Sequence, residues 1–165
     1  DEVSKCSNKL CEEIEVINGV DIYKHIVDDE NQKLLNKKKG TYYTLDLSNL
    51  DIKDTKTGIN IEGALSKVIK RLLKQMNLEN KRCLIVGLGN MSVTPDALGP
   101  YVVDNVIVTR HLFELNKIND GFSNVSALAP GVMGTTGIET YDIISSVVNK
   151  IDADYDIAED ALSTN

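Results

Sequence analysis

Two stretches near the amino end are rich in β-forming residues, and we expect a strand in each. They span residues 20–27 and 41–47, and the cluster at 36–40 before the second stretch is typical of a turn. Further along, between residues 62 and 77, apolar side chains recur at spacings of three and four, with basic side chains on the other face. This period predicts an amphipathic helix.

The second half of the chain alternates short apolar runs with stretches of helical period. Thr136, with Glu139 three residues later, forms a capping-box pattern that predicts a helix start. The expected strands cover residues 83–88, 125–129 and 155–158, and the expected helices cover 99–115 and about 137–150. This β-α-β-α-β order implies right-handed crossovers. We therefore predict an α/β fold with a mostly parallel sheet and helices on both faces.

The composition indicates one globular domain. A chain of 165 residues is close to one domain of about 150 residues. Hydrophobic residues make up 42% and charged residues 26%, and no run approaches the roughly 18 apolar residues of a membrane span. We predict a single α/β domain over residues 1–165, in which residues 1–36 are weakly assigned, and no membrane partner.

Charge and cysteine content indicate which partners and which cellular location to expect. The net charge is −7, and residues 83–165 carry eleven acidic against three basic residues. Binding to a phosphate backbone therefore has no electrostatic support, and we expect no direct nucleic-acid partner. The three cysteines are an odd number, and Cys83 sits in an apolar run where a buried thiol is usual. With no signal-peptide pattern, a cytoplasmic location is expected.

Two aspartates, each opening an Asp-Ala-Leu triplet, follow predicted strands. Asp96 lies in a loop bracketed by Pro95 and Pro100, and Asp160 follows the last strand. The carboxyl ends of parallel strands share one edge of a sheet, so both carboxylates are expected on the same rim. Paired carboxylates can share a proton, one acting as base and the other as acid. By composition alone, Asp96 is more often a helix-cap or turn residue.

Other chemistries have weaker support. Gly87-Leu88-Gly89-Asn90 after a strand suggests dinucleotide binding, but the third glycine of that fingerprint would fall at Ser92. Neither histidine has a second ligand at zinc spacing, and Ser126 lacks the glycines of a nucleophile elbow. We predict no cofactor and no metal.

Several motifs in the second half closely resemble the germination protease family of spore-forming bacteria. They are residues 84–90, 92–100, 108–115, 129–134 and 136–140. The resemblance is strong from about 83 to 162, fair from 37 to 80 and weak over the first 36 residues. It implies an endopeptidase of the spore core that degrades the small acid-soluble proteins coating spore DNA at germination. It also implies a zymogen that removes its own short amino-terminal piece, and a homotetramer.

The resemblance also implies a site. The two catalytic aspartates of the family match Asp96 and Asp160, the pair already identified from the strand ends. The sheet of the family is similar to that of hydrogenase maturation proteases, whose Gly-Leu-Gly-Asn opening looks like residues 87–90 and which recognise nickel. We expect the crevice to be lined by residues whose backbone could serve as oxyanion donors or bind substrate, namely Gly89, Asn90, Thr94, Gly131 and Gly134.

The chain departs from the family pattern in two ways. Glu159 stands where the family has an apolar residue, and the family continues well beyond the second motif. We therefore expect the chain to be an amino-terminal part of a longer protease, with Glu159 at a frayed, solvated end. The predicted function is an aspartic-type endopeptidase of spore germination. The alternatives are a catalytically inert nickel-binding chaperone of the same fold, with acids at the rim, and a regulatory interaction domain.

Overall fold

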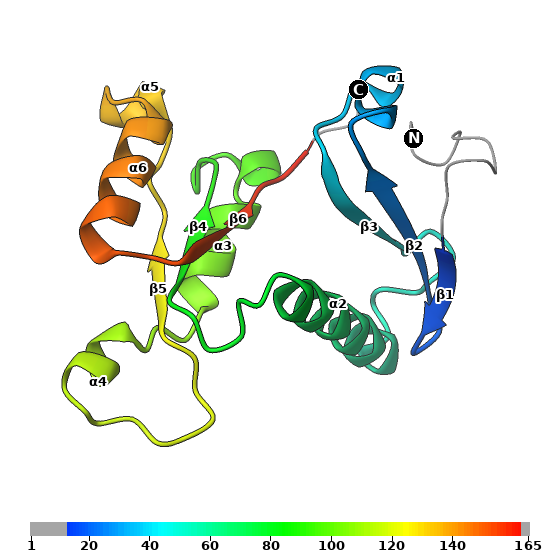
Figure 1. Cartoon of the computed structure of the whole chain (residues 1–165), viewed down its shortest axis with the longest axis horizontal. Coiled ribbons are helices and arrows are strands. Elements are labelled where there is room, and N and C mark those ends of the chain that lie inside the picture. Colours follow the sequence, from blue (N-terminus) through cyan, green and yellow to red (C-terminus); the bar gives the residue numbers. More distant parts are fainter. Residues whose placement is uncertain (1–12, 163–165) are drawn as a thin grey trace. The chain divides into compact units, whose positions relative to one another are not determined.

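The computed structural model describes residues 13–162 (Figure 1). The chain divides into two compact units, which meet in sequence between Met76 and Asn77. Each unit has its own three-stranded sheet. The expectation that the whole chain is one domain stays a prediction.

The first unit contains an antiparallel sheet in the order β1-β2-β3. Its elements are β1 (Glu13–Ile17), β2 (Val20–Val27), α1 (Asn31–Leu35), β3 (Gly40–Asp46) and α2 (Thr55–Gln75). The strands expected at 20–27 and 41–47 are therefore confirmed. β1 is not among the strands predicted from the sequence, although Asn18 and Gly19 join it to β2 with φ values of 53° and 81°, as a tight hairpin turn requires.

The core of the first unit forms where α2 packs on this sheet. Ile17, Val20 and Ile22 are buried together with two α2 residues, Ala64 and Val68. This apolar stripe confirms the amphipathic helix expected between 62 and 77, but the helix begins earlier, at Thr55. The first turn, which lacks the apolar period, is stabilised by the Asp54 carboxylate, which accepts the Thr57 N–H at 2.8 Å.

The second unit contains a parallel sheet in the order β5-β4-β6. Its strands are β4 (Cys83–Gly87), β5 (Val125–Leu128) and β6 (Tyr155–Glu159), close to the three expected ranges. The fold is thus mixed α/β, as predicted. A mostly parallel sheet is not what the structure shows, because β1, β2 and β3 pair as antiparallel neighbours in a sheet of their own.

The helices of the second unit are shorter than expected. They are α3 (Leu98–Asn105), α4 (Arg110–Glu114), α5 (Met133–Thr136) and α6 (Thr140–Ile151), with the 3₁₀ turn η1 (Thr94–Asp96) before α3. The single helix expected over 99–115 is wrong because Thr109 is tied to β5. Its N–H donates to the Val125 carbonyl at 2.9 Å, and its Oγ1 accepts the Val125 N–H at 2.9 Å.

The helix expected from about 137 begins at Thr140, so the predicted capping box does not form. The Thr136 hydroxyl accepts the Ile138 N–H at 3.2 Å and donates to the Val132 carbonyl at 3.2 Å, while Glu139 is the N-cap residue of α6 without a side-chain cap bond. The chain moves across the sheet in one direction from β4 to β5 and in the opposite direction, past β4, from β5 to β6. Right-handed crossovers therefore place α3 and α6 on opposite faces of this sheet. Within residues 13–162, no helix is both long and apolar enough to cross a membrane.

Candidate active site

The candidate site lies where β4 and β6 end side by side. Gly87, the last residue of β4, is opposite Glu159, the last residue of β6. One residue further, the Leu88 N–H donates to the Glu159 carbonyl at 2.8 Å. Asp160 follows directly, so its backbone position is fixed by this end of the ladder.

Asp96 lies in the loop after β4, and that loop is braced by its own backbone. The Asn90 N–H donates to the Asp96 carbonyl at 2.9 Å, and the Asp96 N–H donates to the Val93 carbonyl at 2.8 Å. Gly89 has a φ of +114°, and a β-carbon built there would stand 2.1 Å from the Asp96 carbonyl oxygen and 3.0 Å from its Oδ1. Only glycine fits this close contact.

The two aspartates are therefore anchored to the same dipeptide, Leu88–Gly89. Asp96 packs on Gly89, and Asp160 follows the residue whose carbonyl accepts the Leu88 N–H. Asp96 is half-buried, whereas Asp160 is exposed and its Oδ1 accepts the Ala161 N–H at 2.9 Å. The structure thus brings both residues to one edge of the parallel sheet, and their catalytic role stays a prediction.

The glycines around this edge allow close packing of backbone on backbone. A β-carbon on Gly87 would stand 2.1 Å from the Gly99 carbonyl oxygen, so the first turn of α3 lies directly on the end of β4. Gly99 and Pro100 are both buried. Close packing therefore explains the glycines of the turn after β4 without a bound phosphate group.

The structure ties the other residues expected to line the crevice less directly to Asp96 and Asp160. Thr94 is the exposed first residue of η1, and its carbonyl accepts the Ala97 N–H at 3.4 Å. Gly131 follows β5 with a φ of +73°, and Gly134 lies in α5. The end of β5 reaches the same sheet edge, since Leu128 is opposite Val86. Among residues 13–162, no hydrogen bond links either glycine to Asp96 or Asp160.

The expectation that Glu159 sits at a frayed end is wrong. Glu159 is the final residue of β6 and half-buried, with its carbonyl bonded to Leu88. Arg110, a basic residue of the same unit, bonds Glu114 at 2.9 Å and the Ile151 carbonyl at 2.6 Å.

The remaining reactive side chains of this unit are structural. Cys83 is buried, and burial raises the pKa of its thiol above the usual value. Burial, followed by a hydrogen bond with Cys83, raises the pKa of Tyr155 to about 12. His111 is exposed on α4. In the part of the chain that the structure describes, no three His, Cys, Asp or Glu side chains are grouped as a metal site would require.

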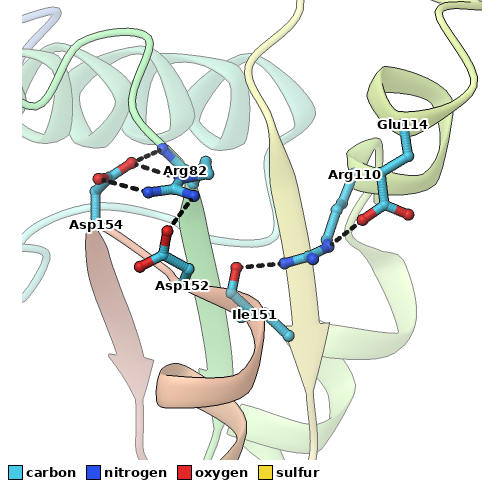
Figure 2. A network of polar contacts seen from close by, with 6 residues as sticks. All are labelled: Arg82, Arg110, Glu114, Ile151, Asp152 and Asp154. Carbon is cyan, nitrogen blue, oxygen red and sulfur yellow. Dashed lines mark hydrogen bonds and ion pairs between the residues drawn. The ribbon is translucent and has the colours of Figure 1, made fainter.

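An ion-pair network that the sequence patterns did not predict lies at the starts of β4 and β6, at the end of the sheet opposite to the two aspartates (Figure 2). Arg82, directly before β4, binds Asp154 through Nε at 3.1 Å and Nη2 at 3.2 Å, and Asp152 through Nη1 at 2.7 Å. These hydrogen bonds hold the pKa of Asp154 at about 2. A signal was present, because the starts of neighbouring parallel strands lie together, and here one carries a base and the other acids.

Two carboxylates at one end of a parallel sheet suit the acid–base chemistry of a hydrolase. Comparison with known proteins agrees with this class. A family model described as germination protease matches residues 1–165, and the chain belongs to the germination protease family, a family of peptidases.

Curated relatives carry the same description. The germination protease of Priestia megaterium is 48% identical over 148 residues, which cover 88% of this chain and 40% of that protein. The germination proteases of Bacillus cytotoxicus and Bacillus mycoides are each 45% identical over 148 residues, with the same coverage. The chain thus spans about 40% of the length of these relatives.

Proposed function

We propose that the protein is an endopeptidase of aspartic type that acts in spore germination, with Asp96 and Asp160 as its catalytic pair. One observation carries this assignment: both aspartates are anchored to the dipeptide Leu88–Gly89 at the end of adjacent parallel strands. Membership of the germination protease family supplies the reaction class.

The chemistry follows from two carboxyl groups that share one proton. The ionised group takes a proton from the attacking water, and the protonated group donates to the oxygen of the scissile carbonyl. The first group then passes its proton to the leaving amine, while the second group takes back a proton from a hydroxyl of the collapsing tetrahedral intermediate. A peptide bond and a water thus become an acid and an amine, and the pair regains its single shared proton.

A backbone donor near the pair would stabilise the developing oxyanion. The Asn90 N–H is already engaged with the Asp96 carbonyl. Within residues 13–162 the Gly89 N–H has no backbone acceptor, which favours Gly89 as the donor. Gly131, Gly134 and Thr94 remain candidates for contacts with the substrate chain.

The substrate and the assembly follow from the family resemblance. We propose the small acid-soluble spore proteins as substrate, a zymogen form, a homotetramer and a location in the spore core. The chain spans about 40% of the relatives' length, so the activity, substrate and assembly of the whole relatives are proposals for this protein.

The test is to incubate the full-length gene product with a purified small acid-soluble spore protein and to follow fragments by mass spectrometry. We expect internal cleavage. A parallel titration with nickel separates the alternative: tight nickel binding without cleavage would replace this proposal with a metal-binding function.

A further inference from the structure

We propose that Arg82 is a positioning residue for Asp160. Its ion pair with Asp154 fixes the register of β6 on β4, and through β6 it sets where Asp160 stands at the far end of the strand. The effect on catalysis rests on the proposed function, whereas the effect on register does not.

The contacts that tie the starts of the two strands involve both side chains and backbone. The Asp154 carboxylate accepts the Arg82 backbone N–H at 2.8 Å in addition to the two guanidinium bonds. In return, the Arg82 carbonyl accepts the N–H groups of Asp154 at 2.9 Å and Tyr155 at 3.3 Å. A bidentate contact of this kind, in which one guanidinium donates two hydrogen bonds to one carboxylate, is called a fork here. It fixes orientation as well as distance.

Arg82 also offsets a repulsion. Asp152 and Asp154 both form ion pairs with the guanidinium of Arg82, as Figure 2 shows, so that one positive charge lies between two negative charges. Nearby, Arg110 donates to the carbonyl of Ile151, the last residue of α6. The turn from α6 into β6 is therefore held by two arginines, of which only Arg82 reaches β6 itself.

Burial of side chains contributes little to the register of β6, which gives the tie at the start of the strand more weight. It has five residues, alternately half-buried and exposed, and none is fully buried. Among the described residues it pairs with β4 alone. A strand with so few buried side chains is prone to slip, and a slip of one residue turns every side chain to the other face.

Such a slip would displace the carboxylate that the proposed mechanism needs. One step along a strand is about 3.3 Å. A misplacement of about 1 Å can lower the rate of an enzyme about a hundredfold. Every residue of β6 from Tyr155 to Glu159 pairs in sequence with β4, so a shift of register at the start of the strand carries through to Asp160.

The first experiment measures register directly, by hydrogen exchange of the full-length gene product and its Asp154→Ala and Arg82→Ala variants. The Leu88 N–H faces β6, bonding Glu159, whereas the Cys83 N–H faces the other side and bonds Asn124. We expect exchange at Leu88 to rise at least about tenfold while Cys83 stays protected. Equal change at both amides, or no change at Leu88, would overturn the proposal.

The second experiment measures kcat and KM for a small acid-soluble spore protein. Arg82→Ala is expected to lower kcat at least about tenfold with KM nearly unchanged, and Arg82→Lys is expected to restore part of the loss. Arg82→Lys also keeps the test decisive if Arg82→Ala does not fold, since a lysine cannot form the fork and should still lower kcat.

The matched control is Arg71→Ala in the first unit. Arg71 binds Glu15 with a similar fork, and the two pairs are similarly exposed, with side-chain accessibilities of 38% and 37% against 42% and 31% for Arg82 and Asp154. We expect its loss to lower stability without changing kcat. A kcat unchanged in both Arg82 variants, or lowered equally in Arg71→Ala, would overturn the positioning role. If the unsubstituted protein cleaves nothing, the proposed function fails, and hydrogen exchange still decides the register.

Discussion

Gly99 of α3 lies directly against Glu159 of β6: a β-carbon built on Gly99 would stand 2.5 Å from the Glu159 carbonyl oxygen. The same β-carbon would stand 2.3 Å from the carbonyl oxygen of Leu88. The start of α3 therefore packs against the backbone ends of both β4 and β6, next to the residue that precedes Asp160.

This contact predicts that Gly99→Ala is severely destabilising. The added methyl group meets backbone atoms, which cannot turn aside as a flexible side chain can, so the helix or the strand end must shift. We expect the free energy of unfolding to fall by about 3 kcal/mol or more in urea denaturation.

Gly134→Ala is the matched control in the same unit. Gly134 also lies in a helix, but a β-carbon there meets nothing within 4 Å, and its φ is not positive. We expect a change of no more than about 1 kcal/mol, in the stabilising direction. Similar losses in the two variants would show that α3 does not pack on the strand ends as described.

The Arg82–Asp154 pair predicts a stability that depends on pH. Hydrogen bonds from Arg82 lower the pKa of Asp154 from 3.8 to about 2 in the folded chain. Because the pKa is lower in the folded state, the contribution of this ion pair to the free energy of unfolding is complete above about pH 4. It is lost as the pH falls to about 2.

The measurement compares urea midpoints of the unsubstituted protein and Asp154→Asn between pH 2 and pH 7. We expect Asp154→Asn to have the lower midpoint at pH 7 and the difference to vanish near pH 2. Asp120→Asn, at an exposed carboxylate outside this pair, is the matched control. A difference between the first two proteins that stays constant with pH would contradict the ion pair.

Chelators are expected to leave cleavage unchanged. The proposed chemistry uses only carboxylates and water, and the described residues offer no cluster of three or more metal-ligating side chains. The check is to assay the full-length gene product after prolonged dialysis against EDTA. Loss of activity that nickel or zinc restores would favour a metal-dependent reaction.

Much of the second unit could be predicted from its sequence because β4 is a continuous apolar run and β5 and β6 are short, mainly apolar runs. Such runs, spaced by helical segments, indicate a parallel sheet, and the place of Asp96 and Asp160 at its edge followed from topology. The first unit was harder to predict. β1 is marked mainly by the turn at Asn18 and Gly19, and the antiparallel pairing of β2 and β3 leaves no signature that distinguishes them from strands of a parallel sheet.

The errors in the second unit arise from competing hydrogen bonds. Thr109 has a helical period on both sides, but its hydrogen bonds to β5 interrupt the helix. Thr136 has the spacing of a capping box, but α5 ends at this residue and its hydroxyl bonds Val132 and Ile138 instead. The bonds of Thr109 cannot be predicted from the local pattern, because β5 comes close to Thr109 only when the chain has folded. The bonds of Thr136 are local, but they compete with the capping box for the same hydroxyl group.

The central claim is tested most directly by measuring cleavage of a small acid-soluble spore protein by Asp96→Asn and Asp160→Asn in the full-length gene product. Asp104→Asn, at an exposed carboxylate of α3, serves as the control. We expect each of the first two changes to lower kcat on the order of a thousandfold, because an amide cannot share a proton as a carboxyl group does, with the unfolding midpoint unchanged. If either Asp96→Asn or Asp160→Asn keeps more than about a tenth of the activity, the two aspartates are not the catalytic pair.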